Sequence, residues 1–407
     1  MIERDEDAIR AKLGSGPKLR RYFDDLRFGP RRRIYPNDSG VWLWREMLLP
    51  GFPKSAIVSL REGQTDLFEI PDWLKKETGL DNLYIKMEGQ GPSESFKDRG
   101  MTVAISDAVR LQRHSAQGIT GVCCASTGDT SAAAAVYSAY VREQLRCIVL
   151  LPHQGTAESQ LFQAIVHGAQ IRAIRHPDGF DACMRLIEAF IVKHPELVLV
   201  NSKNDMRVVG QESIGLEILQ DLSWRVPEWI AVPVGNGGNL TALLNALLLA
   251  KRLGLINRLP GIVAGQTAVS DTLVRWQESD YQNYEPGPRR PTVASAMNIN
   301  NPVSFPRIEK LYGEFDIRFY RVTEAQIERT WEQFLRAGAN VCPQSAVALD
   351  AVLQARHQGV IKPGDVAVAI STASGVKFAH VTKARQPQSN PGLKVVGGTL
   401  RALERSL

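Results

Sequence analysis

The sequence predicts an α/β protein with two open, twisted, mostly parallel sheets flanked by helices. From about residue 80, short runs rich in valine and isoleucine alternate with longer segments rich in alanine and leucine. The short runs are apolar almost throughout, as is typical of strands buried on both faces. Eight such runs are more than a single sheet core usually holds. We therefore expect two domains in this chain of 407 residues.

The elements can be assigned in chain order from these patterns. The expected strands are "NLYIKM" (82–87), "GVCCAS" (121–126), "CIVLLP" (147–152), "QIRAI" (170–174), "LVLVN" (197–201), "WIAVPV" (229–234), "GIVAG" (261–265) and "VAVAI" (366–370). The clearest helical segments are 130–144, 157–170, 180–194 and 345–359. Residues 276–306 are polar with several prolines, which predicts a long loop, either a surface excursion or a lid. The two ends, about 1–35 and 385–407, carry no clear strand pattern.

Composition narrows the classes of partner. The net charge of +6 is concentrated in the segment "PKLRRYFDDLRFGPRRRIYP" (17–36). This segment lacks zinc-finger, RNA-binding and basic-zipper patterns, so we interpret it as a solvated or subunit-facing surface and expect no nucleic-acid partner. The five cysteines form no C-x-x-C pair, which indicates free thiols in a reducing compartment. The polar start and the lack of a long apolar stretch predict a soluble, cytoplasmic protein with no signal peptide or membrane partner. We also expect no metal site.

Glycine-bearing loops follow three of the expected strands, where ligands bind in open α/β sheets. The first, "ASTGDTSAAAA" (125–135), offers the hydroxyls of Ser126, Thr127 and Thr130 at the start of a helix. Such a loop suits a carboxylate or another anion, and an ordinary Ser/Thr helix cap explains the same residues.

The second and third loops carry different chemistry. "PVGNGGNL" (233–240) holds three glycines and two asparagines within five residues, so its backbone can approach a phosphate closely. It lacks the G-x-G-x-x-G dinucleotide pattern and the lysine of a P-loop, and a plain turn is the alternative. In "ISTASGVKF" (370–378), Ser371 and Thr372 bring hydroxyls to the end of a strand.

A fourth segment, "NSKNDMRVVGQES" (201–213), combines an amide, a hydroxyl and a guanidinium in Asn201, Ser202 and Arg207. These groups form a good oxyanion site, because arginine matches phosphate geometry bidentately. A polar turn with a surface arginine is the alternative.

Lys97 is the candidate nucleophile. In "PSESFKDRGM" (92–101), Ser95 and Asp98 have the spacing of a capping box, which places Lys97 in the first turn of a helix. The positive helix end and partial desolvation both disfavour the ammonium form, and a neutral lysine forms Schiff bases. Together with a separate phosphate cradle, such a lysine indicates pyridoxal 5'-phosphate as the cofactor, whereas a capped helix with a solvated lysine is the alternative.

These ordered motifs resemble the plant-type branch of threonine synthase, within the fold-type II (tryptophan synthase β-like) pyridoxal-phosphate enzymes. The matching segments are "SFKDRGMTV", "CASTGDTSAA", "NSKNDMRVVGQE", "GNGGN", "CPQSAVALDAVLQARHQGVI" and "STASGVKF", within a resemblance that runs from about residue 35 to residue 380. The chain departs from the family pattern at Glu94, where the family has glycine, at Gln344 in the family's Pro-His-Thr-Gly, and at Ser374, where the family has histidine.

The resemblance implies a role for each matching residue. Lys97 would carry the cofactor and move protons. Cofactor contacts would come from Phe96 beside the ring, Asp129 near its phenolic oxygen, Thr372 at its ring nitrogen, and Gly235, Asn236, Gly237, Gly238 and Asn239 at its phosphate. The substrate carboxylate would lie at Ser126, Thr127 and Thr130, and its leaving phosphate at Asn201, Ser202 and Arg207.

The resemblance also implies a domain plan and a reaction. Residues 1–100 would form the N-terminal part of a large domain, 101–205 a small α/β domain, and 206–407 the rest of the large domain. The expected protein is a homodimeric amino-acid-biosynthesis lyase that converts O-phosphohomoserine and water to threonine and phosphate. Two alternatives remain open: β-replacement on phosphoserine or a related amino acid, as in cysteate synthase, and a non-catalytic pyridoxal-phosphate-binding homologue.

Overall fold

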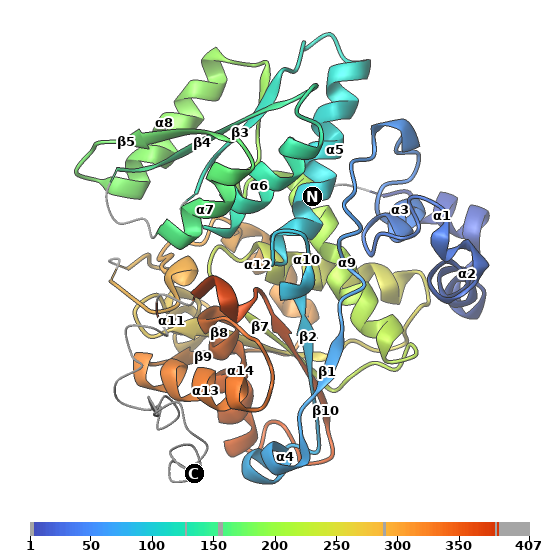
Figure 1. The fold of residues 1–407 in the computed structure, drawn as a ribbon. Helices are drawn as coiled ribbons and strands as arrows, with labels where there is room; N and C mark the ends of the chain where they lie inside the picture. Colours follow the sequence, from blue (N-terminus) through green and yellow to red (C-terminus); the bar gives the residue numbers. More distant parts are fainter. Residues whose placement is uncertain (1–3, 127, 154–157, 288–289, 379–380, 382–407) are drawn as a thin grey trace, which may run out of the picture.

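The computed structural model describes residues 4–126, 128–153, 158–287, 290–378 and 381, and its strands form two separate sheets (Figure 1). The larger sheet has six strands in the order β1-β2-β10-β7-β8-β9, and the smaller has four in the order β5-β4-β3-β6. The large-sheet strands are β1 (Leu67–Glu69), β2 (Asn82–Met87), β7 (Trp229–Pro233), β8 (Gly261–Thr267), β9 (Ile317–Val322) and β10 (Val366–Ser371). The small-sheet strands are β3 (Gly121–Ala125), β4 (Arg146–Pro152), β5 (Gln170–Ile174) and β6 (Leu197–Leu199).

All eight strands expected from the sequence are present, and the two sheets confirm the predicted α/β class. Every pairing is parallel except that of β1 with β2. Two strands were not expected from the sequence: β1, which is only three residues long, and β9, whose "IRFYRV" lies at the edge of the sheet. β9 has a neighbouring strand on one side only and carries an exposed Arg318 and a half-buried Arg321, so it lacks the continuous apolar run that marked the others.

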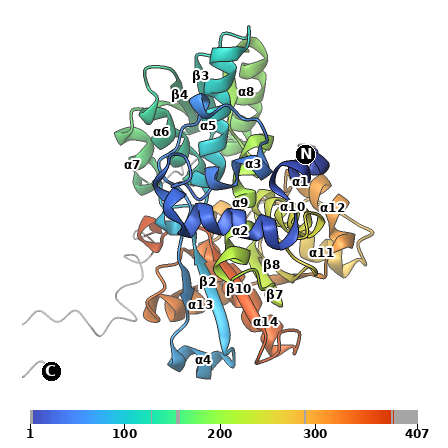
Figure 2. The ribbon, with the colours of Figure 1, turned by 90° about the vertical axis from the view of Figure 1, so that its right-hand side faces the viewer.

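Helices cover both faces of the large sheet and explain its apolar strands (Figures 1 and 2). Along β10, Val368 and Ile370 pack into one core, while Ala367 and Ala369 pack into the other. This alternation follows from the two-residue period of a strand. The main helices are α5 (Lys97–His114), α9 (Asp205–Asp221), α10 (Gly238–Arg252), α11 (Thr272–Glu278), α12 (Phe305–Leu311), α13 (Glu324–Arg336) and α14 (Pro343–His357).

Three further helices, α6 (Asp129–Tyr140), α7 (Glu158–Val166) and α8 (Gly179–Lys193), pack on the small sheet. They and α14 confirm the four helical segments expected from the sequence. None of the described helices is long and apolar enough to cross a bilayer. The five cysteines are free and buried, as expected. We propose residues 101–205 as the small domain, because all four strands of the small sheet fall within them.

The N-terminal segment is helical. Its elements are α1 (Glu6–Leu13), α2 (Gly16–Phe28) and the short α3 (Arg45–Leu48), and α4 (Asp72–Thr78) follows β1. Leu19 and Phe23 of α2 are fully buried against the rest of the molecule, whereas Arg31, Arg32 and Arg33 are exposed. This segment therefore extends the large core and presents its basic side chains to solvent.

Candidate active site

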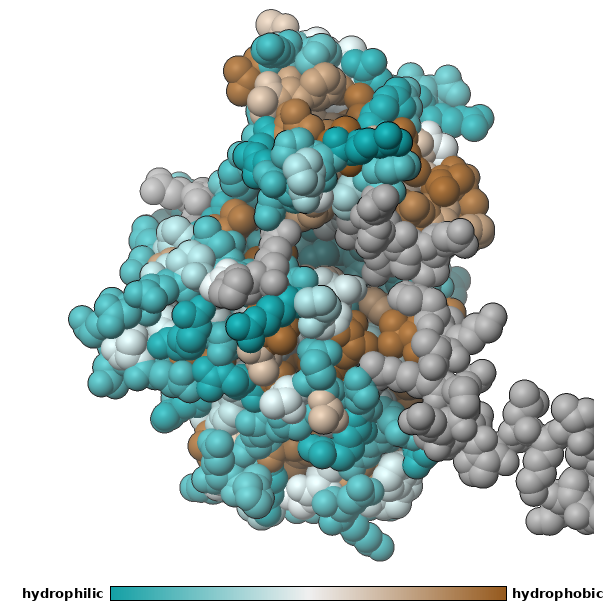
Figure 3. All heavy atoms as spheres, turned by 90° about the vertical axis from the view of Figure 1, so that its left-hand side faces the viewer, coloured by the Kyte–Doolittle hydropathy of each residue, from teal (hydrophilic) through white to brown (hydrophobic). Residues whose placement is uncertain are grey.

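A cavity lies where the loops after the parallel strands meet, and the surface between the two sheet-bearing parts of the molecule is hollowed (Figure 3). The wall of this cavity is formed by motifs that are far apart in the sequence. The lining residues are Phe96, Lys97, Asp129, Ser202, Arg207, Val208, Gln211, Pro233, Gly235, Asn236, Gly237, Gly238, Asn239, Ala296, Met297, Gln344 and Thr372. The structure thus gathers at one cavity most of the residues that the sequence analysis proposed separately. The long loop 276–306 contributes Ala296 and Met297 to the same wall.

Lys97 is the first residue of α5 and faces this cavity. Its ammonium lies 3.9 Å from the centre of the Phe96 ring. Desolvation, reinforced by the positive charge of Arg207 and opposed by Asp129, lowers the pKa of Lys97 to about 7. A lysine with that pKa is substantially neutral at neutral pH and can attack a carbonyl group.

The expected capping box is wrong. Phe96 is the N-cap of α5, no side chain caps the helix, and the Ser95 hydroxyl has no partner among the described residues. The Asp98 carboxylate instead accepts a hydrogen bond of 2.9 Å from the amide of Ser93, because the chain before the helix folds back over its first turn. Burial raises the pKa of Asp98 to about 7. Lys97 nevertheless lies in the first turn, as predicted.

Two glycines bring Lys97 and Arg207 together. Helices α5 and α9 cross at Gly100 and Gly210, and a Cβ atom at Gly100 would lie 2.7 Å from the carbonyl oxygen of Arg207. A Cβ at Gly210 would collide with the carbonyl of Arg99. Only glycine permits this approach, which places the first turns of both helices at one edge of the cavity.

Arg207 is a buried guanidinium without a carboxylate partner among the described residues. Its side chain donates to the Val200 carbonyl at 2.9 Å and to the Thr130 hydroxyl at 3.4 Å, and its Nε has no partner. Only 2% of the residue is exposed, and burial lowers its pKa to about 10. A buried cation of this kind attracts an anion into the cavity.

The other two members of the predicted oxyanion set differ in position. Ser202 lines the cavity. The amide of Asn201 instead bonds the backbone of Ala125 in both directions, at 2.9 and 2.8 Å, and so fixes the end of β3. Ser126 accepts a bond of 3.2 Å from the Gly128 amide, and Thr127 lies outside the described residues.

The glycine loop 235–239 lines the same cavity. Gly237 has a φ of +79°, and a Cβ there would lie 2.7 Å from the side chain of Ile308. Helix α10 begins at Gly238, so its free amides face the cavity. The side chain of Asn239 is buried and has no hydrogen-bond partner at either polar atom among the described residues. These are the properties of an anion cradle.

Thr372 directly follows β10, within a cluster of small polar side chains. The Ser345 hydroxyl accepts a bond of 2.9 Å from the Thr372 amide, and the Cys342 sulfur lies 3.6 Å from the Thr372 hydroxyl. That hydroxyl has no carboxylate among its contacts. A ring nitrogen placed against it would therefore meet a neutral partner.

The residues present fit pyridoxal 5'-phosphate. A neutralisable amine, an anion cradle with an unpartnered amide, and a neutral hydroxyl lie around one cavity, each on a separate element. They match the aldehyde, the phosphate and the ring nitrogen of that cofactor.

The sequence analysis missed Gln211 as a site residue and noted Gln344 only as a departure from a family motif. Both line the cavity and are buried, with at most 4% of each residue exposed. Both carry side-chain amide atoms that have no hydrogen-bond partner among the described residues. It also missed the role of Gly100 and Gly210, although a glycine inside a helical pattern is a signal of close packing.

Comparison with known proteins agrees with this chemistry. The model of the family "Pyridoxal-phosphate dependent enzyme" matches residues 58–373. The chain is 35% identical to the chloroplastic threonine synthase 2 of Arabidopsis thaliana, over 93% of this chain and 72% of that protein. It is also 35% identical to the threonine synthase of Methanocaldococcus jannaschii, over 85% of this chain and 82% of that protein.

Solved structures share the fold. The threonine synthase of Escherichia coli superposes with a TM-score of 0.67 at 22% identity, covering 99% of this chain and 86% of that one. Maize serine racemase superposes with a TM-score of 0.64 at 18% identity, covering 80% of this chain and 92% of that one. The family match, the threonine synthase relatives and the cavity chemistry together show that this chain belongs to the pyridoxal-phosphate dependent enzymes, as a threonine synthase-like member.

Proposed function

We propose that this enzyme converts O-phosphohomoserine and water to threonine and phosphate. One observation carries the proposal: Arg207, a buried cation without a carboxylate partner among the described residues, faces the same cavity as the neutralisable Lys97. A substrate with a phosphate leaving group uses both, since the phosphate needs a cation and its departure needs a base.

Lys97 is the proposed proton carrier. In its neutral form it removes the proton from the α carbon and then from the β carbon of the substrate. When bound, pyridoxal 5'-phosphate delocalises the negative charge that this leaves on carbon. Lys97 lies in the first turn of α5, which the Gly100–Gly210 crossing holds, so its amine is positioned before the substrate arrives.

Arg207 and Ser202 are proposed to bind the leaving phosphate. The bond between the γ carbon and the phosphate oxygen breaks, and Arg207 stabilises the dianion that departs. The two protons that Lys97 removed return to the substrate, one to the γ carbon, which becomes the methyl group of threonine, and one to the α carbon. Water supplies the hydroxyl group at the β carbon, and its remaining proton goes to the departing phosphate. Asn201 bonds the backbone of Ala125, so we propose that it holds the loop that begins at Ser126 in place. Ser126, Thr127 and Thr130 of that loop are proposed to bind the substrate carboxylate.

The cofactor is proposed to lie with its phosphate in the loop 235–239 and its ring nitrogen at Thr372, between Phe96 and Asp129. A neutral hydroxyl leaves the ring nitrogen less protonated than a carboxylate would, which suits elimination and replacement reactions.

The test is to incubate the pure protein with O-phosphohomoserine and, separately, with phosphoserine plus sulfite, and to measure phosphate and the amino-acid product. Threonine and phosphate in equal amounts from the first mixture support the proposal. Cysteate from the second mixture, without threonine from the first, would replace it with a β-replacement enzyme. A cofactor absorbance band without turnover in either would indicate a cofactor-binding homologue that is not catalytic.

We also propose a cytoplasmic homodimer. Support comes from the five buried free thiols and from the exposed apolar side chains of Phe28, Ile34 and Tyr35 beside the arginine cluster 31–33. Light scattering of the pure protein tests the dimer, and a monomeric mass would exclude it.

A further inference from the structure

Lys377 lies in the short 3-10 helix η7 (Gly375–Phe378) after β10, and its ammonium has three acceptors. It lies 2.8 Å from Oδ1 of Asp129, 2.7 Å from the carbonyl oxygen of Ser93 and 3.1 Å from Oε1 of Gln163. An ammonium has three N–H groups, so all of its donors are used. Only 9% of the Lys377 side chain is exposed. Such complete pairing fixes the position of a side chain that is otherwise among the most flexible.

The three acceptors belong to different parts of the fold. Asp129 begins α6 and Gln163 lies in α7, both of which pack on the small sheet, while Ser93 precedes Lys97. Lys377 itself follows the last strand of the large sheet, and η7 packs against α7. One ammonium therefore joins the small-sheet part to the large-sheet part at the segment that leads into the reactive lysine.

Of the three acceptors, Asp129 is the one that affects the pKa of Lys97. Its carboxylate lines the cavity with Lys97, and it opposes the two effects, burial and Arg207, that lower the pKa of Lys97. In the structure the carboxylate is paired with Lys377 rather than with Lys97. Among the described residues, the charges that act on Lys97 are those of Arg207 from α9 and Asp129 from α6. The charge of Lys377 also acts on Asp98, the next residue of α5, and that of Asp129 acts on Cys342, before α14.

We propose that Lys377 is a positioning residue that holds the Asp129 carboxylate away from Lys97 and braces α6 and α7 against the segment leading into Lys97. Without Lys377, Asp129 would lose the cation with which it is paired and would still face the nitrogen of Lys97, whose pKa it raises. That carboxylate would then favour the protonated nitrogen.

The test is a pH titration of the absorbance band of the holoenzyme, which reports protonation of the Lys97 nitrogen joined to the cofactor. Lys377→Met should raise the midpoint by about one pH unit, a tenfold change in the proton equilibrium. Lys377→Arg keeps the positive charge and should restore the midpoint to that of the wild type. Asp129→Asn should lower it, and Lys377→Met in that background should shift it no further.

Gln163→Leu is the matched control, because it removes one of the three contacts and leaves the pair with Asp129. It should move the midpoint by less than about 0.3 pH unit. Three results would overturn the proposal: an unchanged midpoint in Lys377→Met, an equal shift in Gln163→Leu, or an equal shift when Asp129 is already asparagine. If Lys377→Met fails to fold, the Asp129→Asn and Lys377→Arg midpoints still decide, since an unchanged midpoint in Asp129→Asn removes the carboxylate from the mechanism.

Discussion

Lys97 and Arg99 lie two residues apart at the start of α5 and have opposite surroundings. Arg99 is 1% exposed and bonds Glu88 at 2.5 and 2.7 Å and Glu217 at 2.7 Å, so its pKa is raised well above the ordinary value. Lys97 faces the cavity without a paired carboxylate, and its pKa is lowered to about 7. One helical turn thus carries a cation that is paired with carboxylates and a cation whose pKa is lowered.

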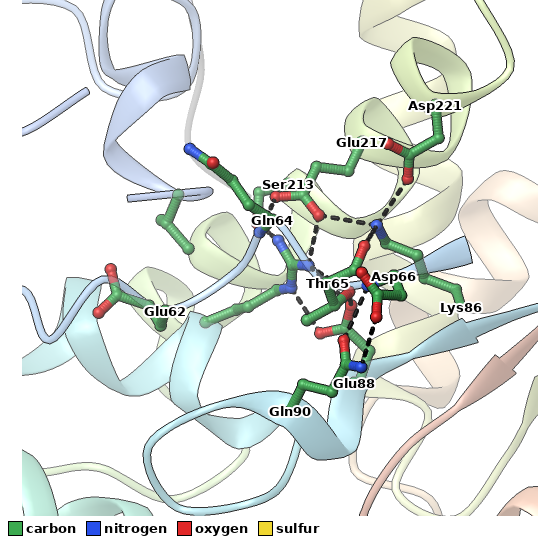
Figure 4. A network of polar contacts seen from close by, with 12 residues as sticks. Glu62, Gln64, Thr65, Asp66, Lys86, Glu88, Gln90, Ser213, Glu217 and Asp221 are labelled. Atoms are coloured by element: carbon green, nitrogen blue, oxygen red, sulfur yellow. Dashed lines mark hydrogen bonds and ion pairs between the residues drawn. The ribbon is translucent and has the colours of Figure 1, made fainter. Parts of the chain in front are cut away.

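The side of α5 that carries Arg99 belongs to a buried network of charged residues (Figure 4). Lys86 points at Glu217 and Asp221, at 2.9 and 2.7 Å, and Glu217 is shared with Arg99. The pKa of Glu217 is lowered because the attraction of Arg99 and Lys86 outweighs its desolvation. Burial therefore lowers the pKa of a cation only where no carboxylate is paired with it.

The largest effect is expected at the reactive cation. Lys97→Ala should abolish trapping of the cofactor by borohydride and all turnover, because Lys97 supplies the only amine among the described residues that line the cavity. Peptide mass spectrometry after reduction of the wild type gives the test. Lys86 is the internal control, since it is fully buried and paired with Glu217 and Asp221. A reduced adduct on Lys86 or any other lysine would refute the assignment.

The paired cation should matter for stability. Arg99→Met leaves Glu88 and Glu217 buried with less compensation and should lower the free energy of unfolding by about 3–5 kcal/mol, measured by urea denaturation. Arg336→Met removes an exposed pair with Glu332 and should cost under about 1 kcal/mol. Equal losses in the two variants would contradict the contrast between buried and exposed pairs.

Arg207 should matter for the substrate and not for stability. Arg207→Met should lower kcat/KM for O-phosphohomoserine by about 10–100-fold, since charged hydrogen bonds contribute about 1.5–3 kcal/mol. Cofactor affinity should stay the same, and the free energy of unfolding should not fall, because an uncompensated buried charge has been removed. Arg307→Met, which removes a partly exposed arginine paired with Asp205, is the control. Unchanged kinetics in Arg207→Met would remove it from the phosphate site.

The smallest effect is expected at Glu94, whose backbone has a φ of +59°. The threonine synthase pattern has glycine at this position. The backbone of Glu94 is held in this left-handed conformation by bonds to Gly91 and Ser374, at 2.9 and 3.0 Å. Glu94→Gly should therefore stabilise the protein by about 0.5–1 kcal/mol. Glu94→Ala removes the same carboxylate but keeps a Cβ, so it should give no such gain. If both variants stabilise equally, the charge and not the backbone is responsible.

The sequence by itself determined the α/β class and the eight apolar strands, and it predicted Lys97 in the first turn of a helix and the glycine loop 235–239. These follow from local patterns: an apolar run specifies a buried strand, and a loop of glycines specifies close backbone approach. Lys97 and Arg207 were also named from short motifs, each with an alternative interpretation that its own segment did not exclude.

Only the tertiary structure decided which charges are paired. Lys97, Arg99, Arg207 and Lys377 are all basic residues in polar motifs, and the sequence gives no sign that two of them have carboxylate partners and two do not. The partners come from residues between 11 and 248 positions away, such as Glu88 for Arg99 and Asp129 for Lys377. Electrostatic pairing depends on distance and desolvation in space, so packing alone determines which cation is left to react.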